Sequence, residues 1–269
     1  MTLAGIELVY LVKDIGEKTS GYYASNIWGI NRNSLLFKLH HPTKPDIMLM
    51  VSSIGMWITD KKIETIEPNK MLRRLRSDLL RAKLTKIEQI GTERIAYFTF
   101  TNFEKELTLI VEFFGDGNII LCNEERKILA LLHSIDVRHR QLRVGLEYAP
   151  PPEDGVDVLN LTKESFRELF STSGIGKTIG RGLGLPKKYV EEIIRLSGID
   201  PKKPSNEVTN EEFEALYEII TSTLSKVTQG PHDPSVIIED DVHDAYPIRF
   251  SDDNLNAKVL KFFFLHYIK

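Results

Sequence analysis

The sequence predicts an α+β protein, in which an antiparallel β domain built as a sandwich or barrel is followed by a small helical domain. Three observations favour this class. Short apolar runs separated by turn-forming residues fill most of the first 150 residues, which is typical of hairpin-connected strands. Three consecutive prolines at 150–152 end that pattern, because proline continues neither a strand nor a helix. Apolar residues at helical spacing come after them.

The first expected element is a short helix over residues 1–16. Leu3, Ile6 and Val9 follow one side of it, and Glu7 lies within its first turns. Four apolar runs come next, divided by Asn, Pro, Ser and Gly residues that favour turns. They predict strands over residues 22–30, 35–40, 47–51 and 56–59. This succession indicates an antiparallel meander.

A basic helix is expected to begin at Lys70. Leu72, Leu75 and Leu79 recur at helical spacing, so they can face a core while charged residues face outward. Between positions 70 and 86, basic residues outnumber acidic ones in a chain of formal net charge -3. They are Lys70, Arg73, Arg74, Arg76, Arg81, Lys83 and Lys86, against the single acid Asp78. By sign alone, phosphate binding and a merely solvated face are equally good interpretations.

More strands are expected after this helix. They cover residues 84–90, 95–100, 107–113, 118–122 and 128–133, with a tight turn at 115–117. Glu93 and Arg94 lead into the second of them. They are therefore expected at the edge of the sheet, where functional residues are often held.

The region after the prolines has helix signals. Thr162 and Thr209 are suited to begin helices, and Gly198 to end one. Strand-like segments follow at 236–239 and 246–248, and a new helix is expected over 254–269. We therefore expect a β domain over residues 1–150, a helical domain over 155–230, and a return segment with the start of a further helix over 231–269.

Composition limits the function classes. The chain is 42% hydrophobic and 27% charged, as in ordinary globular proteins. Its single cysteine, Cys122, excludes an intramolecular disulfide framework and a cysteine-based zinc site within this sequence. With neither a leader pattern nor an apolar run of roughly 20 residues, the expected location is cytoplasmic and no membrane partner is expected. No cofactor is predicted.

Two glycine-rich stretches suggest phosphate contacts. Residues 174–178 end in Gly-Lys-Thr, but the first glycine of a phosphate loop would fall on Ser171, so nucleotide hydrolysis is disfavoured. Residues 182–186, followed by a helix, fit the hairpin of a helix-hairpin-helix unit, in which free backbone N–H groups could meet a phosphate. A turn that only packs two helices is an equally good interpretation. The seven histidines lack metal-site spacing.

The sequence resembles, over essentially its whole length, the N-terminal part of NFACT proteins, the ribosome quality-control group that includes RqcH and NEMF, and four stretches carry the resemblance in order. They run over 74–76 with 88–95 (RLR, EQIGTERI), over 112–121 (EFFGDGNIIL) and over 145–151 (GLEYAPP). Bacterial members of this family were named fibronectin-binding protein A. The resemblance implies a domain similar to the β-sandwich of formamidopyrimidine DNA glycosylases, then a helix-hairpin-helix region over 182–198. It also implies a coiled coil and a C-terminal RNA-binding domain beyond this chain.

The resemblance implies that the protein binds tRNA and a large ribosomal subunit carrying an obstructed peptidyl-tRNA, and recruits tRNA for untemplated tailing of the nascent chain. It would not be an enzyme, because the ribosome forms the bonds. The family's tRNA-binding residues fall on Glu7, Glu93 and Arg94, where both acids replace aspartate. Phosphate contacts are expected from Arg73, Arg74, Arg76 and Arg81. Further candidate RNA contacts are Arg138, Arg140, Arg143, Lys187 and Lys188.

Two alternatives belong to other classes. A DNA-binding or repair protein related to the glycosylases is disfavoured, because those enzymes use an N-terminal proline and glutamate whereas this chain begins Met1-Thr2-Leu3. A fibronectin-binding adhesin rests on the family's older name alone. Cleavage of a duplex containing a damaged base would identify the first alternative.

Overall fold

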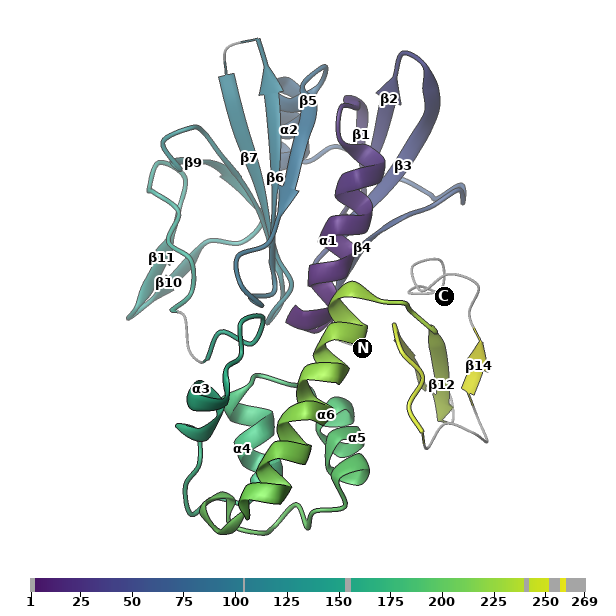
Figure 1. Cartoon of the computed structure of the whole chain (residues 1–269). Helices are drawn as coiled ribbons and strands as arrows, with labels where there is room; N and C mark the ends of the chain where they lie inside the picture. The colour runs from purple at the N-terminus through teal and green to yellow at the C-terminus, as the bar shows by residue number, and fades with distance from the viewer. Residues whose placement is uncertain (1–2, 104, 153–155, 240–241, 252–256, 260–269) are drawn as a thin grey trace. The chain divides into compact units, whose positions relative to one another are not determined.

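The computed structural model describes residues 3–103, 105–152, 156–239, 242–251 and 257–259 (Figure 1). The chain divides into two compact units, with the boundary after Pro152. The first unit is mostly antiparallel sheet with two helices, and the second is mostly helical. The α+β class predicted from the sequence is confirmed.

Nine strands of the first unit form one sheet in the order β4-β3-β2-β1-β5-β6-β7-β8-β9. Every neighbouring pair is antiparallel, so the predicted meander is confirmed. The strands are β1 Tyr23–Asn31, β2 Ser34–His41, β3 Lys44–Ser52, β4 Gly55–Ile58, β5 Lys83–Glu88, β6 Ile95–Asn102, β7 Lys105–Glu112, β8 Asn118–Cys122 and β9 Ile128–Leu131.

The sheet consists of two halves that meet along a short seam. β1 and β5 share the single register pair Tyr23 and Lys83, with backbone hydrogen bonds confined to residues 21–24 and 81–84. Beyond this seam, the free edge of β1 is met by other groups. The N–H of Ile66 donates to the carbonyl of Gly29 at 2.8 Å. The halves β1–β4 and β5–β9 therefore diverge from a common junction.

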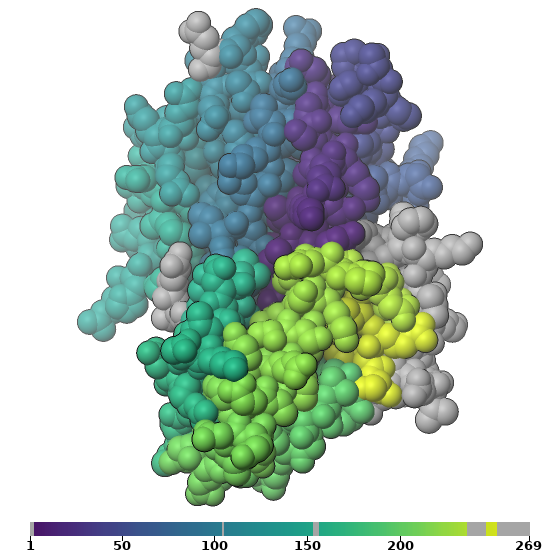
Figure 2. Space-filling model, in the orientation of Figure 1, coloured from purple at the N-terminus to yellow at the C-terminus, as the bar shows by residue number. Residues whose placement is uncertain are grey.

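Two helices pack on different parts of this sheet. α1, Gly5–Thr19, packs against β5 and also contacts β4 and β6, and its purple surface lies between the two groups of strands (Figure 2). α2, Lys70–Leu79, packs against β1 and contacts β9. Asn69 caps α2 by accepting from the N–H of Leu72 at 2.8 Å. The predicted apolar side of α2 is confirmed as buried, and each buried leucine contributes about 1.5–3 kcal/mol.

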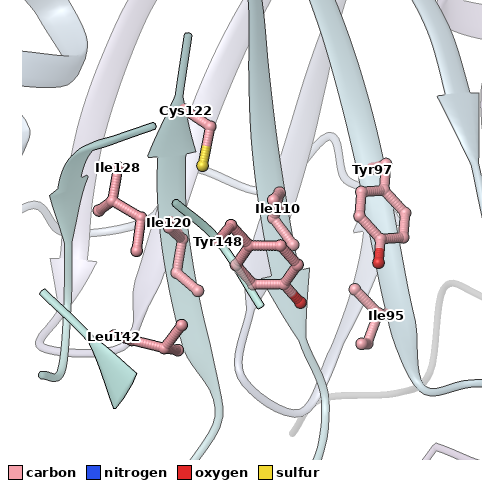
Figure 3. Packing of buried hydrophobic residues seen from close by; sticks show 8 residues of the cluster. All are labelled: Ile95, Tyr97, Ile110, Ile120, Cys122, Ile128, Leu142 and Tyr148. Atoms are coloured by element: carbon pink, nitrogen blue, oxygen red, sulfur yellow. The ribbon is translucent and has the colours of Figure 1, made fainter. Parts of the chain in front are cut away.

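A cluster of buried side chains joins β6–β9 to the segment that follows them (Figure 3). It contains Ile95, Tyr97, Ile110, Ile120, Cys122, Ile128, Leu142 and Tyr148. Leu142 lies on β11, Arg140–Leu142, which pairs with β10, Ile135–Val137. The sequence had not predicted this hairpin. Beside it, the buried Glu112 carboxylate accepts from Arg140 and, at 2.9 Å, from the Tyr148 hydroxyl.

The second unit is built from helices in which most predicted boundaries are confirmed. Thr162 and Thr209 cap α3 and α6, and Gly198 ends α5 with φ 68°. α4 begins at Ile175, so a turn between helices, the alternative to a phosphate loop over 174–178, is wrong for residues 175–178, which are helical. The helices are α3 Lys163–Arg167, α4 Ile175–Gly182, α5 Lys187–Ser197 and α6 Asn210–Gln229, with a 3-10 turn at Ser205–Glu207.

Three short strands close the described chain. β12, Ser235–Glu239, pairs with β13, Val242–Tyr246, and with β14, Ala257–Val259. The helix predicted over 254–269 is therefore wrong at residues 257–259, which pair as a strand. The remaining residues of that range lie outside the described part of the chain.

Candidate nucleic-acid interface

Glu7 lies in the first turn of α1, where its carboxylate closes the helix end. Its Oε2 accepts a hydrogen bond from the N–H of Ala4 at 2.9 Å, and its side chain is buried. Ala4 has no side-chain oxygen to cap the helix, so Glu7 takes over part of that task. A negative charge is also favourable at this end of a helix. The predicted acid is thus held in one orientation by its own helix.

Glu93 and Arg94 lie in the connection from β5 to β6. Gly91 turns the chain with φ 54°, and the N–H of Glu93 donates to the carbonyl of Ile90 at 3.2 Å. The carbonyl of Arg94 accepts from the N–H of Phe113 at 2.8 Å, which ties this connection to the end of β7. The backbone of both residues is therefore fixed by the sheet, and their side chains are half-buried.

The α1 start and this connection are in direct contact. A Cβ placed on Gly5 would lie 1.7 Å from the carbonyl oxygen of Thr92, so only glycine permits the approach. Gln89 bridges the same two segments, with Nε2 donating to the carbonyls of Gly5 at 2.9 Å and Glu93 at 2.6 Å. The structure thus brings together the segments that carry Glu7, Glu93 and Arg94.

Arg94 supplies the cation of this group. Among the residues that the structure describes, its guanidinium forms no hydrogen bond or ion pair. Five N–H donors in a planar fork suit a phosphate or the edge of a base. The arrangement is therefore a cation on a fixed backbone, next in sequence to the half-buried Glu93, which suits recognition of an anionic ligand that also offers hydroxyl or amino donors.

The four arginines predicted on and after α2 differ in what they can do. Arg74 pairs with Asp78 at 2.5 Å, and Arg76 donates through Nε to the carbonyl of Ile27 at 2.7 Å. Arg73 and Arg81 are exposed. β5 separates Arg81 from Arg94 by about 20 Å, and α2 packs on other strands than α1 does. The two predicted groups are therefore separate patches of one unit.

The second basic run contains one structural arginine. Arg140 is buried, and its guanidinium donates to Glu112 and to the carbonyl of Ala149. Burial lowers its pKa, but the hydrogen bond and charge of Glu112 outweigh this and leave that pKa raised. Arg143 is exposed and paired with Asp136. Arg138 is exposed as well. We therefore leave Arg140 out of any RNA-binding surface.

Lys187 and Lys188 occupy the first turn of α5. Pro186 precedes them and offers no capping side chain. Lys187 lies 3.4 Å from Glu191, and Lys188 lies over the ring of Phe250. Two cations at a helix N-terminus are unfavourable unless anions offset them, and Glu191 already offsets part of the charge of Lys187. A phosphate contact at these lysines stays a prediction.

The Gly-Lys-Thr stretch does not form a phosphate loop. The N–H groups of Ile175 and Gly176 donate to the carbonyls of Lys203 at 2.9 Å and Pro201 at 3.1 Å. A Cβ on Gly174 would lie 2.8 Å from the Pro201 carbonyl oxygen. The amides that would hold a phosphate are already occupied, in agreement with the prediction from spacing.

Two searches of the described residues gave negative results. Within that part of the chain, no group of three or more His, Cys, Asp or Glu side chains is placed to bind a metal ion. None of its helices combines the length and apolar character required to span a bilayer.

Sequence reasoning missed the role of Gln89, because a single glutamine at the end of a strand carries no recognisable pattern. One of its acceptors, the carbonyl of Glu93, lies four residues away in the chain, and the other, the carbonyl of Gly5, lies 84 residues away. Only the fold shows that one side chain joins them.

Comparison with known proteins gives a family and several relatives. The model of NFACT N-terminal and middle domains matches residues 5–263. The archaeal Rqc2 homolog aRqcH of Methanocaldococcus jannaschii is 30% identical over 226 residues, covering 80% of this chain and 33% of that protein. Ribosome quality control complex subunit NEMF of Mus musculus is 23% identical over 78% of this chain and 20% of its own length. The chain thus spans about a third or less of these relatives.

Solved structures show the same fold. The fibrinogen binding protein from Staphylococcus aureus superposes with a TM-score of 0.79 at 18% identity, over 96% of this chain and 95% of that one. The N-terminal part of the fibronectin/fibrinogen-binding protein from Streptococcus suis gives a TM-score of 0.76 at 18% identity, over 97% and 96%. At this identity the likeness concerns the fold alone.

Proposed function

The chain belongs to the family of NFACT N-terminal and middle domains, and from this premise we propose that it is the tRNA- and ribosome-binding part of a ribosome quality-control factor. Its curated relatives carry ribosome quality control in their names. The proposed partners are tRNA and a large ribosomal subunit that holds an obstructed peptidyl-tRNA. The proposed outcome is recruitment of tRNA for untemplated C-terminal tailing, with the peptide bonds made by the ribosome.

The observation that carries this proposal is the placement of Arg94. Its backbone is fixed by β7, and its guanidinium has no partner among the described residues. The start of α1, with the Glu7 carboxylate, lies against the same connection. A side chain on a fixed backbone needs less ordering when it binds than one on a mobile loop, and this favours affinity. The half-buried Glu93 carboxylate can accept from a ribose 2′-OH or a base amino group, whereas the buried Glu7 carboxylate closes the end of α1.

Arg73 and Arg81 form a second, separate set of contacts in this proposal. Both are exposed, and a tRNA is long enough to reach beyond both ends of β5. Such contacts to phosphate add affinity without adding sequence preference. Their strength falls with rising salt, because binding releases counterions. The whole-chain charge of -3 makes such local patches necessary.

The test measures tRNA affinity of the 269-residue chain for wild type, Arg94→Ala and Lys44→Ala. Lys44 is exposed at the start of β3, so its replacement removes one positive charge away from the proposed site. Removal of a bidentate arginine contact costs about 1–3 kcal/mol, which is about 5- to 150-fold in affinity. Lys44→Ala should stay within about twofold.

Equal effects of the two variants would refute the placement of the site at Arg94. Absence of tRNA binding by the wild-type chain would refute the proposed function. Cleavage of a damaged-base duplex would instead favour a glycosylase.

A further inference from the structure

Gln89 directly follows β5, and its amide donates both of its hydrogens to two different segments, one of which is distant in the sequence. Nε2 donates to the carbonyl of Gly5 at 2.9 Å and to that of Glu93 at 2.6 Å. A side-chain amide nitrogen carries two protons, so both are engaged. The orientation of the amide follows from these bonds, since the reverse orientation would set its oxygen against two carbonyl oxygens.

The two acceptors belong to the segments that carry the proposed binding residues. Gly5 is the first residue of α1, two positions before Glu7, and Glu93 directly precedes Arg94. Gly5 also packs on the backbone of residue 92 with no space for a Cβ. The close packing brings the segments together, and the Gln89 amide fixes them laterally.

The amide oxygen of Gln89 shows that a glutamine at this position has an energetic cost. Its Oε1 is buried and accepts no hydrogen bond from the described residues. A buried acceptor without a donor is unfavourable. Methionine has a similar length and would fill the position without that penalty. The two hydrogen bonds that Gln89 Nε2 donates therefore contribute something that the packing of the side chain alone would not.

We propose that Gln89 is a positioning residue for tRNA binding, which holds Arg94 in a fixed place relative to Glu7 without itself contacting RNA. The proposal rests on the function proposed above. Functional groups bind well when neighbouring hydrogen bonds hold them in their productive geometry. Without the Gln89 bridge, the 90–94 connection would keep its sheet bonds but would no longer be tied to α1.

The first test is a double-mutant cycle in tRNA binding. Gln89→Met removes no charge, and we expect it to weaken binding about tenfold by displacing Arg94. In the Arg94→Ala background the same substitution should have no further effect, because Gln89 acts through that residue. Gln141→Met is the matched control, since it removes one exposed hydrogen bond to Asp136 in the same unit. It should leave affinity unchanged.

The salt dependence provides a second readout that a decrease in stability would not mimic. The slope of log affinity against log salt falls by about 0.7–0.9 for each phosphate that the protein no longer neutralises. Gln89→Met should change this slope by the same amount as Arg94→Ala does, although it leaves the charge of the protein unchanged. Equal weakening by Gln89→Met with and without Arg94 would overturn the proposal.

Hydrogen exchange of the free protein tests the positioning without RNA. In Gln89→Met, amides of residues 4–8 and 90–94 should exchange faster, and those of residues 136–142 should not. Gln89→Asn keeps an amide but is too short to reach both carbonyls, so it should have the same effect on exchange. It provides an independent test in case Gln89→Met misfolds. Unchanged exchange in both variants would overturn the proposal. If tRNA fails to bind the wild type, the proposed function falls, and exchange still decides the role of Gln89.

Discussion

Replacing Arg140 by methionine should destabilise the first unit by about 3–5 kcal/mol. The substitution leaves the Glu112 carboxylate, only 1% exposed, without its arginine partner. Among the described residues, the Tyr148 hydroxyl remains as its side-chain donor. Removing the counter-charge of a buried group costs far more than breaking an exposed pair, which costs about 1 kcal/mol or less. Arg143→Met, at the exposed pair with Asp136, is therefore the matched control.

Urea unfolding followed by tryptophan fluorescence measures this difference. Both tryptophans of the chain, Trp28 and Trp57, lie in the same unit as Glu112 and Arg140. With a slope of about 2 kcal/mol per molar urea, Arg140→Met should lower the midpoint by about 2 M. The double variant Glu112→Leu/Arg140→Met should recover most of the stability, because it removes both charges together. A midpoint within about 0.5 M of wild type for Arg140→Met, or a double variant no better than the single one, would refute the reasoning.

Three other outcomes follow from single residues. Phe103 is 98% exposed with φ 53°, so Phe103→Asn should raise the unfolding free energy by about 1 kcal/mol, as measured by urea titration. Gly117→Ala should cost at least about 2 kcal/mol, because its Cβ would lie 2.1 Å from that of Ser53; Gly115→Ala has open space and should cost less. Burial raises the pKa of Cys122 from 9.0 to about 11, so its stabilising contribution is complete below pH 9.0 and disappears as pH rises through about 11. That decline should be smaller in Cys122→Val.

The strands could be predicted from the sequence because each is a local pattern. Alternating apolar runs and their turns located β1–β9, and Leu72, Leu75 and Leu79 located the buried side of α2. β10 and β11 were not predicted because Arg140 and its neighbours resemble a basic surface run. The burial of Arg140 on β11 instead involves Glu112, which lies 28 residues earlier and supplies the partner for the guanidinium. No local pattern contains that information.

The candidate site also has some features that the sequence predicted and others that it could not predict. Sign and resemblance pointed to Glu7, Glu93 and Arg94, and the fold places their segments in contact. The burial of Glu7 could not be foreseen, since it depends on how α1 packs against the sheet. Arg76 likewise resembles a surface cation in the sequence, yet its guanidinium donates to the carbonyl of Ile27 on the open edge of β1. Such roles arise only when distant backbone groups need partners.

The narrow junction between β1 and β5 has a consequence for the order of folding. Within each half, every strand pairs with the next one along the chain, so short loops bring the partners together. The junction instead joins residues 21–24 to residues 81–84. These two segments can pair only after the long stretch of chain between them has become compact. Pairings between segments distant in sequence form slowly. The two meanders are therefore expected to form first and independently, with the Tyr23 and Lys83 pairing as the late step that commits the domain to its native topology.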